Sequence, residues 1–166
     1  MKITDVRMET YRWSCPIRTS EGRFIFGYDG LDVARVQTDE GITGIGLGWA
    51  VVGDGTIVRS IASELKHYAL GRDPLYNEGI WADMWGSKDL GRRGISTRVI
   101  SSIDIALWDI KGKAAGMPLY KVLGGYTDSV PAYISLGFRG DGPAQIGKFM
   151  EDAVSNGVRA IKMQIG

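Results

Sequence analysis

The first third of the chain alternates between apolar and polar residues, with the period of two that is typical of β-strands. Residues 2–13 alternate loosely, residues 31–38 more regularly, and residues 42–49 make a third such stretch. Asp39-Glu40-Gly41, between the second and third stretches, has the composition of a tight turn. The pattern therefore predicts an antiparallel meander.

The middle third changes to apolar residues spaced three or four apart, which is the period of an amphipathic helix. Asp73 followed by Pro74 signals the start of one helix. The longest is expected from about Ile95 to Ala115. Asp54 can cap an earlier helix, whose predicted apolar face comprises Ile57, Ile61, Leu65 and Tyr68.

The last part of the chain has a different order of elements. Residues 130–135 and 158–165 read as short apolar strands, and residues 143–155 between them read as a helix. Such a βαβ unit places its two strands parallel, with a right-handed crossover. We therefore expect two domains, residues 1–125 and residues 126–166.

Composition excludes several classes of function. The chain has 166 residues, and 20 basic against 19 acidic residues give a net charge of +1. With no basic block, neither nucleic acid nor an anionic membrane is expected as a partner. No apolar run approaches the roughly 20 residues that span a bilayer. Cys15 is the single cysteine, which fits a reducing cytoplasm.

The scarcity of cysteine and histidine also limits the chemistry. Cys15 and His67, one residue of each type, cannot build a structural zinc site of the usual kind. A catalytic pair of these two residues stays open, although no further feature of the sequence favours it.

Four segments resemble a known family. Residues 102–113, SIDIALWDIKGK, are similar to the long capping-domain helix of the mandelate racemase and muconate lactonizing enzyme families of the enolase superfamily. Residues 117–125, MPLYKVLGG, are similar to the segment that follows that helix. The opening KITDV at 2–6 and the GITGIG hairpin at 41–46 also fit, in the same order and spacing.

This resemblance implies a fold and a chemistry. The fold would be an α+β capping domain, an antiparallel meander followed by helices, joined to the first βαβ unit of a TIM-type (β/α) barrel that is incomplete in this chain. Family members abstract the proton α to a carboxylate, and a divalent metal, usually Mg²⁺, stabilises the enediolate. A Lewis acid suits this step because ionising such a carbon acid adds a second negative charge.

The same resemblance places the metal ligands on the third to fifth barrel strands. Those strands are not expected within this chain, so we assign no metal ligand here. Asp104 and Asp109 lie on the capping helix. We expect them to pack or to form hydrogen bonds with neighbouring elements.

The family carries a Lys-x-Lys pattern at the end of the second barrel strand. This chain has Lys162 and Gln164 at the matching positions. Alternate residues on a strand point the same way, so both would face the substrate. Gln164 cannot take a proton but could hydrogen-bond the substrate. Proton abstraction would then fall to Lys162 or to a base on a later strand, and the alternative is that Lys162 is a solvated strand-end lysine.

Residues 16–30 and 48–55 correspond, by the same resemblance, to two loops that close over the barrel mouth and select the substrate. Arginine suits a carboxylate because it can form two parallel hydrogen bonds, and hydroxyl groups suit a sugar. The alternative is that these are ordinary exposed loop residues. The candidate substrate-binding residues are Arg18, Ser20, Arg23, Tyr28, Trp49 and Asp54.

We expect a full-length protein to act on a small-molecule hydroxy-carboxylate, as a sugar-acid dehydratase. Racemisation and cycloisomerisation are the alternatives within the superfamily. A catalytically inactive fragment that serves only in folding or assembly is the alternative of another class. A homo-oligomer is expected as well, because the chain has several tryptophans and an exposed barrel edge.

Overall fold

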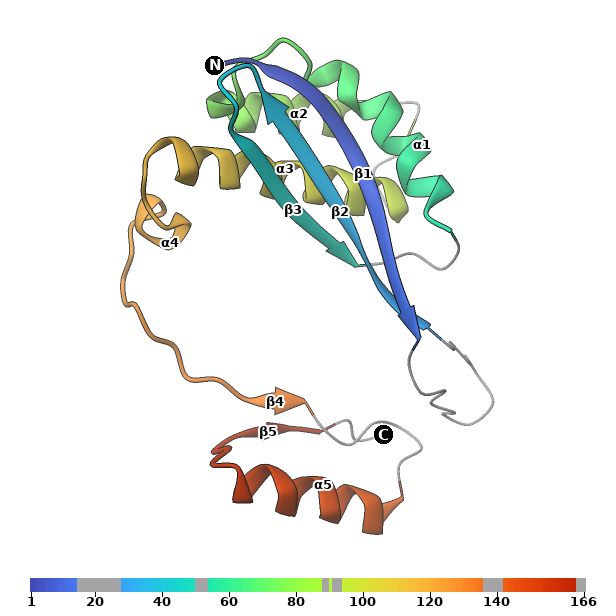
Figure 1. The fold of residues 1–166 in the computed structure, drawn as a ribbon, viewed down its shortest axis with the longest axis vertical. Coiled ribbons are helices and arrows are strands. Elements are labelled where there is room, and N and C mark those ends of the chain that lie inside the picture. Colours follow the sequence, from blue (N-terminus) through green and yellow to red (C-terminus); the bar gives the residue numbers. More distant parts are fainter. Residues whose placement is uncertain (15–27, 50–53, 88–89, 91–93, 136–141, 164–166) are drawn as a thin grey trace. The chain divides into compact units, whose positions relative to one another are not determined.

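The computed structural model divides the chain into two compact units. The first unit comprises Met1–Trp13 and Asp29–Gly125, and the second comprises the other residues. The first is a sheet covered by helices, and the second is a strand–helix–strand element (Figure 1). The structure describes all residues except 15–27, 50–53, 88–89, 91–93, 136–141 and 164–166.

The sheet of the first unit has the strand order β1 (Ile3–Ser14), β2 (Tyr28–Thr38) and β3 (Thr43–Trp49). β2 and β3 are antiparallel, with Leu31 opposite Trp49. β1 and β2 also run in opposite directions (Figure 1). The predicted antiparallel meander is therefore confirmed.

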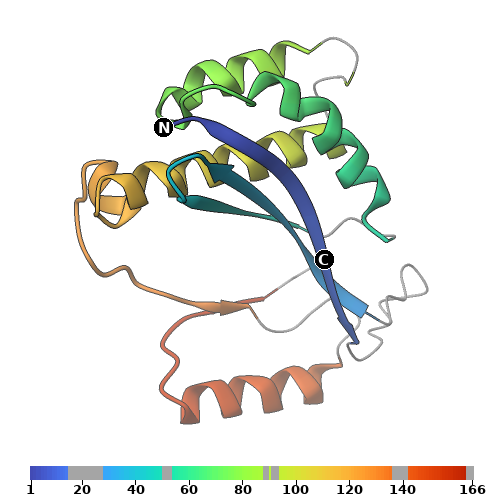
Figure 2. The same cartoon turned by 45° about the horizontal axis from the view of Figure 1, so that its top comes forward.

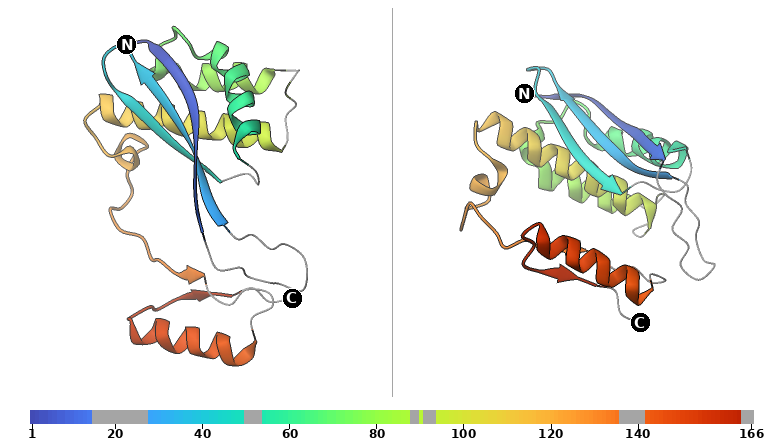
Figure 3. Two further views of the ribbon diagram at one scale, coloured as in Figure 1. Left: turned by 45° about the vertical axis from the view of Figure 1, so that its right-hand side comes forward. Right: turned by 60° about the horizontal axis from the view of Figure 1, so that its bottom comes forward.

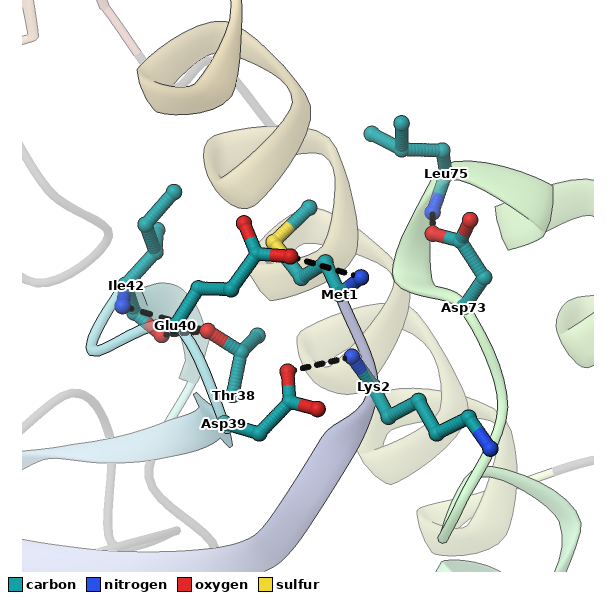
Figure 4. Close-up of polar contacts among 8 residues, drawn as sticks. All are labelled: Met1, Lys2, Thr38, Asp39, Glu40, Ile42, Asp73 and Leu75. Atoms are coloured by element: carbon teal, nitrogen blue, oxygen red, sulfur yellow. Dashed lines mark hydrogen bonds and ion pairs between the residues drawn. The ribbon is translucent and has the colours of Figure 1, made fainter.

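The turn between β2 and β3 is tied to the first residues of the chain (Figure 4). The backbone N–H of Lys2 donates to Asp39 Oδ1 at 2.7 Å, and the Met1 ammonium lies 2.7 Å from a Glu40 carboxylate oxygen. The hydrogen bond to Glu40 raises the pKa of this ammonium. Gly41 has φ 81°, a left-handed conformation that glycine adopts without strain. These contacts fix one end of the sheet.

Helices cover one face of the sheet (Figures 2 and 3). The helix expected after Asp73 opens with a short 3₁₀ turn, where Asp73 Oδ1 accepts a hydrogen bond from the Leu75 backbone at 3.0 Å. No helix within the described residues is both long and apolar enough to cross a membrane. The helical segments are α1 (Thr56–Leu65), η1 (Lys66–Tyr68), η2 (Pro74–Tyr76), α2 (Asn77–Gly86), α3 (Ile95–Ala114) and α4 (Leu119–Val122).

The hydrophobic core lies between the sheet and these helices. On α1 the buried residues are Val58, Ala62 and Leu65, whereas Ile57 is 52% exposed. Of the predicted face, Leu65 lies in the core and Ile61 and Tyr68 pack against it, whereas Ile57 was wrong and the buried position at the start of the helix is Val58. The core also includes Ile3, Val6, Met8, Val36, Ile80, Met84, Val99, Ile100, Ile103, Leu107 and Ile110.

β3 approaches α3 through a row of glycines. A β-carbon on Gly44 would overlap the carbonyl oxygen of Ala106, and one on Gly46 would overlap the carbonyl oxygen of Ser102. One on Gly48 would lie 2.5 Å from the Ser102 hydroxyl. Because a side chain at Gly44 or Gly46 would collide with helix backbone, and one at Gly48 with the Ser102 side chain, the alternate glycines allow strand and helix to touch directly.

The second unit is a parallel strand pair with a connecting helix. β4 (Ile134–Ser135) pairs with β5 (Ile161–Lys162), and α5 (Pro143–Ser155) lies between them in sequence. The helix has the predicted bounds, whereas both strands are shorter than predicted. Among the described residues from 126 to 163, Ala153 is the one buried hydrophobic residue.

Candidate functional site

The junctions of both predicted substrate loops lie at one end of the sheet. Strand directions alternate, so the end of β1, the start of β2 and the end of β3 coincide there (Figure 1). Leu31 near the start of β2 pairs with Trp49, the last residue of β3. The start of α1 joins them, because Gly55 packs against the Thr10 side chain of β1. The opposite end holds the turn that is tied to Met1.

Asp54 lies two residues before the start of α1 at this loop end. Its Oδ1 accepts a hydrogen bond from the Thr56 backbone at 2.9 Å, and its carbonyl oxygen accepts one from Arg59 Nη1 at 3.0 Å. Gly55 occupies the cap position with φ 82°. Hydrogen bonds from Thr56 lower the pKa of the Asp54 carboxyl, so it is ionised at neutral pH. Asp54 therefore accepts the N–H of the first residue of α1 from one position before the cap and does not occupy the predicted cap position itself. Its carboxylate is exposed to solvent.

A buried carboxylate that sequence analysis missed lies below the same end. Asp32 is 1% exposed, and its Oδ1 accepts a hydrogen bond from the Thr10 hydroxyl at 2.7 Å. This bond joins β1 to β2 close to the loop junctions. A signal was present in the sequence, because Asp32 shares the buried face of β2 with Ala34 and Val36.

The structure places some of the other predicted site residues and leaves several undescribed. Lys162 ends β5, opposite Ser135 of β4, and is exposed. Tyr28 begins β2 and Trp49 ends β3, each described by its backbone. Four predicted residues lie outside the described part of the chain, namely Arg18, Ser20, Arg23 and Gln164.

The described residues do not fit a magnesium site. They contain no cluster of three or more His, Cys, Asp or Glu side chains that could hold a metal ion. Asp109 Oδ2 instead accepts hydrogen bonds from the Ile45 backbone at 2.8 Å and from Lys113 Nζ at 2.7 Å. The expectation that Asp109 hydrogen-bonds a neighbouring element is therefore confirmed.

Asp104 belongs to a polar contact between α2 and α3. Burial raises the pKa of its carboxyl, a tendency that the neighbouring Asn77 and Lys111 oppose. Lys111 Nζ donates to Asn77 Oδ1 at 2.6 Å and lies 4.4 Å from the centre of the Trp108 ring. The side chains of α2 and α3 are thereby held together.

A cavity of about 630 Å³ adjoins this contact, with Arg72, Tyr76, Glu78 and Lys111 among its lining residues. None of the predicted site residues lines it. Arg72 is already engaged, because its Nη1 pairs with Asp83 at 2.5 Å. The charges around the cavity are of both signs, so it does not select one class of ligand.

A three-stranded antiparallel sheet with helices on one face and its loop junctions at one end is the architecture of an enolase-superfamily capping domain. The model of the mandelate racemase / muconate lactonizing enzyme N-terminal domain matches residues 3–124. The chain belongs to this family, as its sequence motifs indicated.

Similar curated proteins are enzymes of sugar-acid metabolism. The chain is 36% identical over 168 residues to the 3,6-anhydro-α-L-galactonate cycloisomerase of Streptomyces coelicolor, covering 99% of this chain and 46% of that protein. It is 35% identical over 136 residues to the L-talarate/galactarate dehydratase of Salmonella typhimurium, covering 81% of this chain and 34% of that protein. The chain thus spans half or less of the length of these relatives.

Solved structures give the same relationship. A racemase from Streptomyces coelicolor with bound magnesium superposes with a TM-score of 0.86 at 35% identity, covering 99% of this chain and 47% of that one. The L-talarate/galactarate dehydratase of Salmonella typhimurium, liganded with magnesium and L-lyxarohydroxamate, superposes with a TM-score of 0.85 at 29% identity. That match covers 99% of this chain and 44% of the dehydratase.

Proposed function

We propose that this chain is the N-terminal part of a magnesium-dependent enzyme that removes the α-proton of a sugar-acid carboxylate, acting as a dehydratase. The observation that carries the proposal is the family match over residues 3–124, together with relatives that are dehydratases, cycloisomerases and racemases. Cycloisomerisation is the second candidate, supported by the 36% identity to a cycloisomerase over almost the whole chain.

In this proposal the α-carbon loses its proton to a base, and the electron pair moves into the carboxylate as an enediolate. For a dehydratase, the β-hydroxyl group then leaves as water when it takes up a proton. Lys162 is placed at the reacting centre as a cation or as the base itself, and Gln164 as a neutral hydrogen-bond donor. Magnesium would add Lewis-acid stabilisation, held by residues other than those described in this chain.

The loop end of the sheet is proposed to recognise the substrate. Arg18 and Arg23 suit its carboxylate, because guanidinium groups bind carboxylates through paired hydrogen bonds. Ser20, Tyr28 and Asp54 suit its hydroxyl groups, and Trp49 would supply an apolar surface. Support comes from the fold, in which both loop junctions meet at this end.

We also propose that residues 126–166 begin a TIM-type barrel, and that the protein is a cytoplasmic homo-oligomer. The parallel pairing of β4 with β5 supports the first point. The single cysteine supports a reducing compartment. Exposed apolar side chains such as Ile57, at 52%, and Leu123, at 62%, support association.

The test is isotope exchange by a full-length version of the protein. We expect it, with magnesium, to exchange the α-proton of at least one acid sugar with solvent deuterium, and to release water from that substrate. NMR and mass spectrometry of a broad sugar-acid library would measure both. Exchange with ring opening or epimer formation in place of water loss would favour a cycloisomerase or a racemase.

Two variants test the assigned roles in the same assay. Lys162→Ala should lose ~100-fold or more in rate, because it removes positive charge where negative charge develops. Gln164→Ala should lose less, because a neutral hydrogen bond is roughly half as strong as a charge-assisted one. A larger loss for Gln164→Ala would reverse the roles. Absence of both exchange and water loss, with folded and metal-loaded enzyme, would contradict the proposed function.

A further inference from the structure

The outer edge of β3 is covered by two side chains of α3. In the β2–β3 pair the backbone groups of Thr43 and Ile45 point away from β2, toward the free edge. The N–H of Ile45 donates to Asp109 Oδ2 at 2.8 Å. The carbonyl oxygen of Thr43 accepts from Lys113 Nζ at 2.7 Å. Asp109 and Lys113 are themselves paired at 2.7 Å, so one ion pair satisfies a donor and an acceptor of the edge.

The sequence of β3 would make its edge prone to pair with another strand if the edge were uncovered. Its open face carries Ile45, 38% exposed, and Leu47, 55% exposed. Its other face carries alternate glycines, which offer no side chains to specify how the strand pairs. An apolar, glycine-rich edge strand with free backbone groups is a template for another strand.

We propose that Asp109 and Lys113 form an edge clamp that prevents β3 from pairing with β3 of a second copy of this chain. A second copy is the fitting occupant because two identical edges can pair antiparallel about a two-fold axis, with Ile45 and Leu47 of both copies on one apolar face. The clamp also fixes the register of β3 against α3, since it grips backbone at two positions. This inference is independent of the proposed function.

The experiment compares the 166-residue chain with its Asp109→Ala variant. Amide hydrogen exchange by NMR should show Ile45 protected in the wild type and exchanging about tenfold faster in the variant, the factor expected for the loss of one ordinary hydrogen bond. Light scattering coupled to gel filtration should show the variant at a higher mass than the wild type, increasing with concentration. Unchanged mass together with unchanged Ile45 protection would overturn the proposal.

Three further variants identify the surface and the interaction. Asp109→Asn keeps an acceptor oxygen at the same place, so it should retain the wild-type mass and protection. Leu47→Lys added to Asp109→Ala places a charge on the uncovered edge, so it should restore the mass but not the protection. Asp83→Ala removes another ion-paired carboxylate, one on α2 that is 56% exposed against 33% for Asp109, and should leave both readouts unchanged.

Two results would place the association elsewhere and overturn the proposal. In the first, the variant that carries both Asp109→Ala and Leu47→Lys still associates to the same extent as Asp109→Ala alone. The other is Asp83→Ala associating to the same extent. If Asp109→Ala does not fold, as judged by circular dichroism, Lys113→Ala uncovers the Thr43 carbonyl and takes its place in each comparison.

Discussion

Two aspartates of the first unit, one half-buried and one exposed, have opposite effects on its stability. Burial raises the pKa of Asp104, so folding disfavours its ionised form. Hydrogen bonds from Thr56 lower the pKa of Asp54, so its ionised form is favoured. Near neutral pH both groups are charged in the unfolded chain. The fold therefore gains stability from ionised Asp54 and loses stability from ionised Asp104.

Asp104→Asn is expected to raise the free energy of unfolding at neutral pH. A raised carboxyl pKa gives stability that is complete below the ordinary value of 3.8 and is lost as the pH rises through the folded-state pKa. The gain from the substitution should therefore vanish in acid. Urea denaturation at a series of pH values would measure it.

Asp54→Asn is the matched control for that experiment, with the opposite sign. Its contribution is present above the ordinary pKa of 3.8 and is lost as the pH falls through the lowered value. The substitution should therefore cost stability at neutral pH and have no effect in strong acid. A loss of stability for Asp104→Asn at neutral pH would show that its hydrogen bonding outweighs the effect of burial.

At the scale of elements, the packing of α3 on β3 depends on the absence of side chains. Gly46→Ala is expected to destabilise the chain by about 1–3 kcal/mol, because the new methyl group meets helix backbone that cannot move aside easily. Gly86→Ala, at the end of α2, is the control, since a β-carbon there has nothing within 4 Å. It should change stability by no more than about 1 kcal/mol. Chemical denaturation compares the two, and an unaffected Gly46→Ala would contradict the steric account.

Sequence patterns predicted elements well where the signal is local. The long run of apolar residues at three- and four-residue steps predicted α3, and Pro143 marked the start of α5. Both helices were predicted to within a residue or so of their observed bounds. The short strands β4 and β5 were predicted too long, because a strand extends only as far as a partner pairs with it. The sequence indicated that the glycines of β3 belong to a strand. It did not show why these positions are glycine, because the helix that packs against them lies about 60 residues later in the chain.

At the scale of the whole molecule, the two units differ in how much they bury. All residues of the hydrophobic core cluster belong to the first unit. In the second, Ile146, Phe149 and Met150 of α5 are only partly buried, and Ala153 alone among the described residues is fully buried. The first unit therefore holds most of the apolar burial that stabilises the chain.

A fragment of residues 1–125 is accordingly expected to unfold cooperatively, with a urea midpoint close to that of the whole chain. A fragment of residues 126–166 should be largely unstructured, because segments of about 40 residues rarely fold without a disulfide or a metal. Circular dichroism during urea titration would measure both. A cooperative transition in the shorter fragment, or none in the longer one, would contradict this division of stability.

The candidate site was less predictable than the fold. The hydrogen bond from Thr56 to Asp54 follows from local chemistry. The alternation of β2 places Asp32 on one face with Ala34 and Val36, but the hydrogen bond from Thr10 that satisfies its buried carboxylate depends on the neighbouring strand. Lys162 and Gln164 were assigned through family resemblance, since a lysine at a strand end carries no signal of its own. Residues of such a site come from distant segments, so local periodicity does not indicate that they meet.

The two ends of the sheet differ in the contacts that the described residues make there. At one end, Met1, Lys2, Asp39 and Glu40 are joined by specific contacts. At the other, the described core ends before the segments that join Ser14 to Tyr28 and Trp49 to Asp54. The contacts at the Met1 end therefore belong to the part of the scaffold that an engineered version of this domain has to keep.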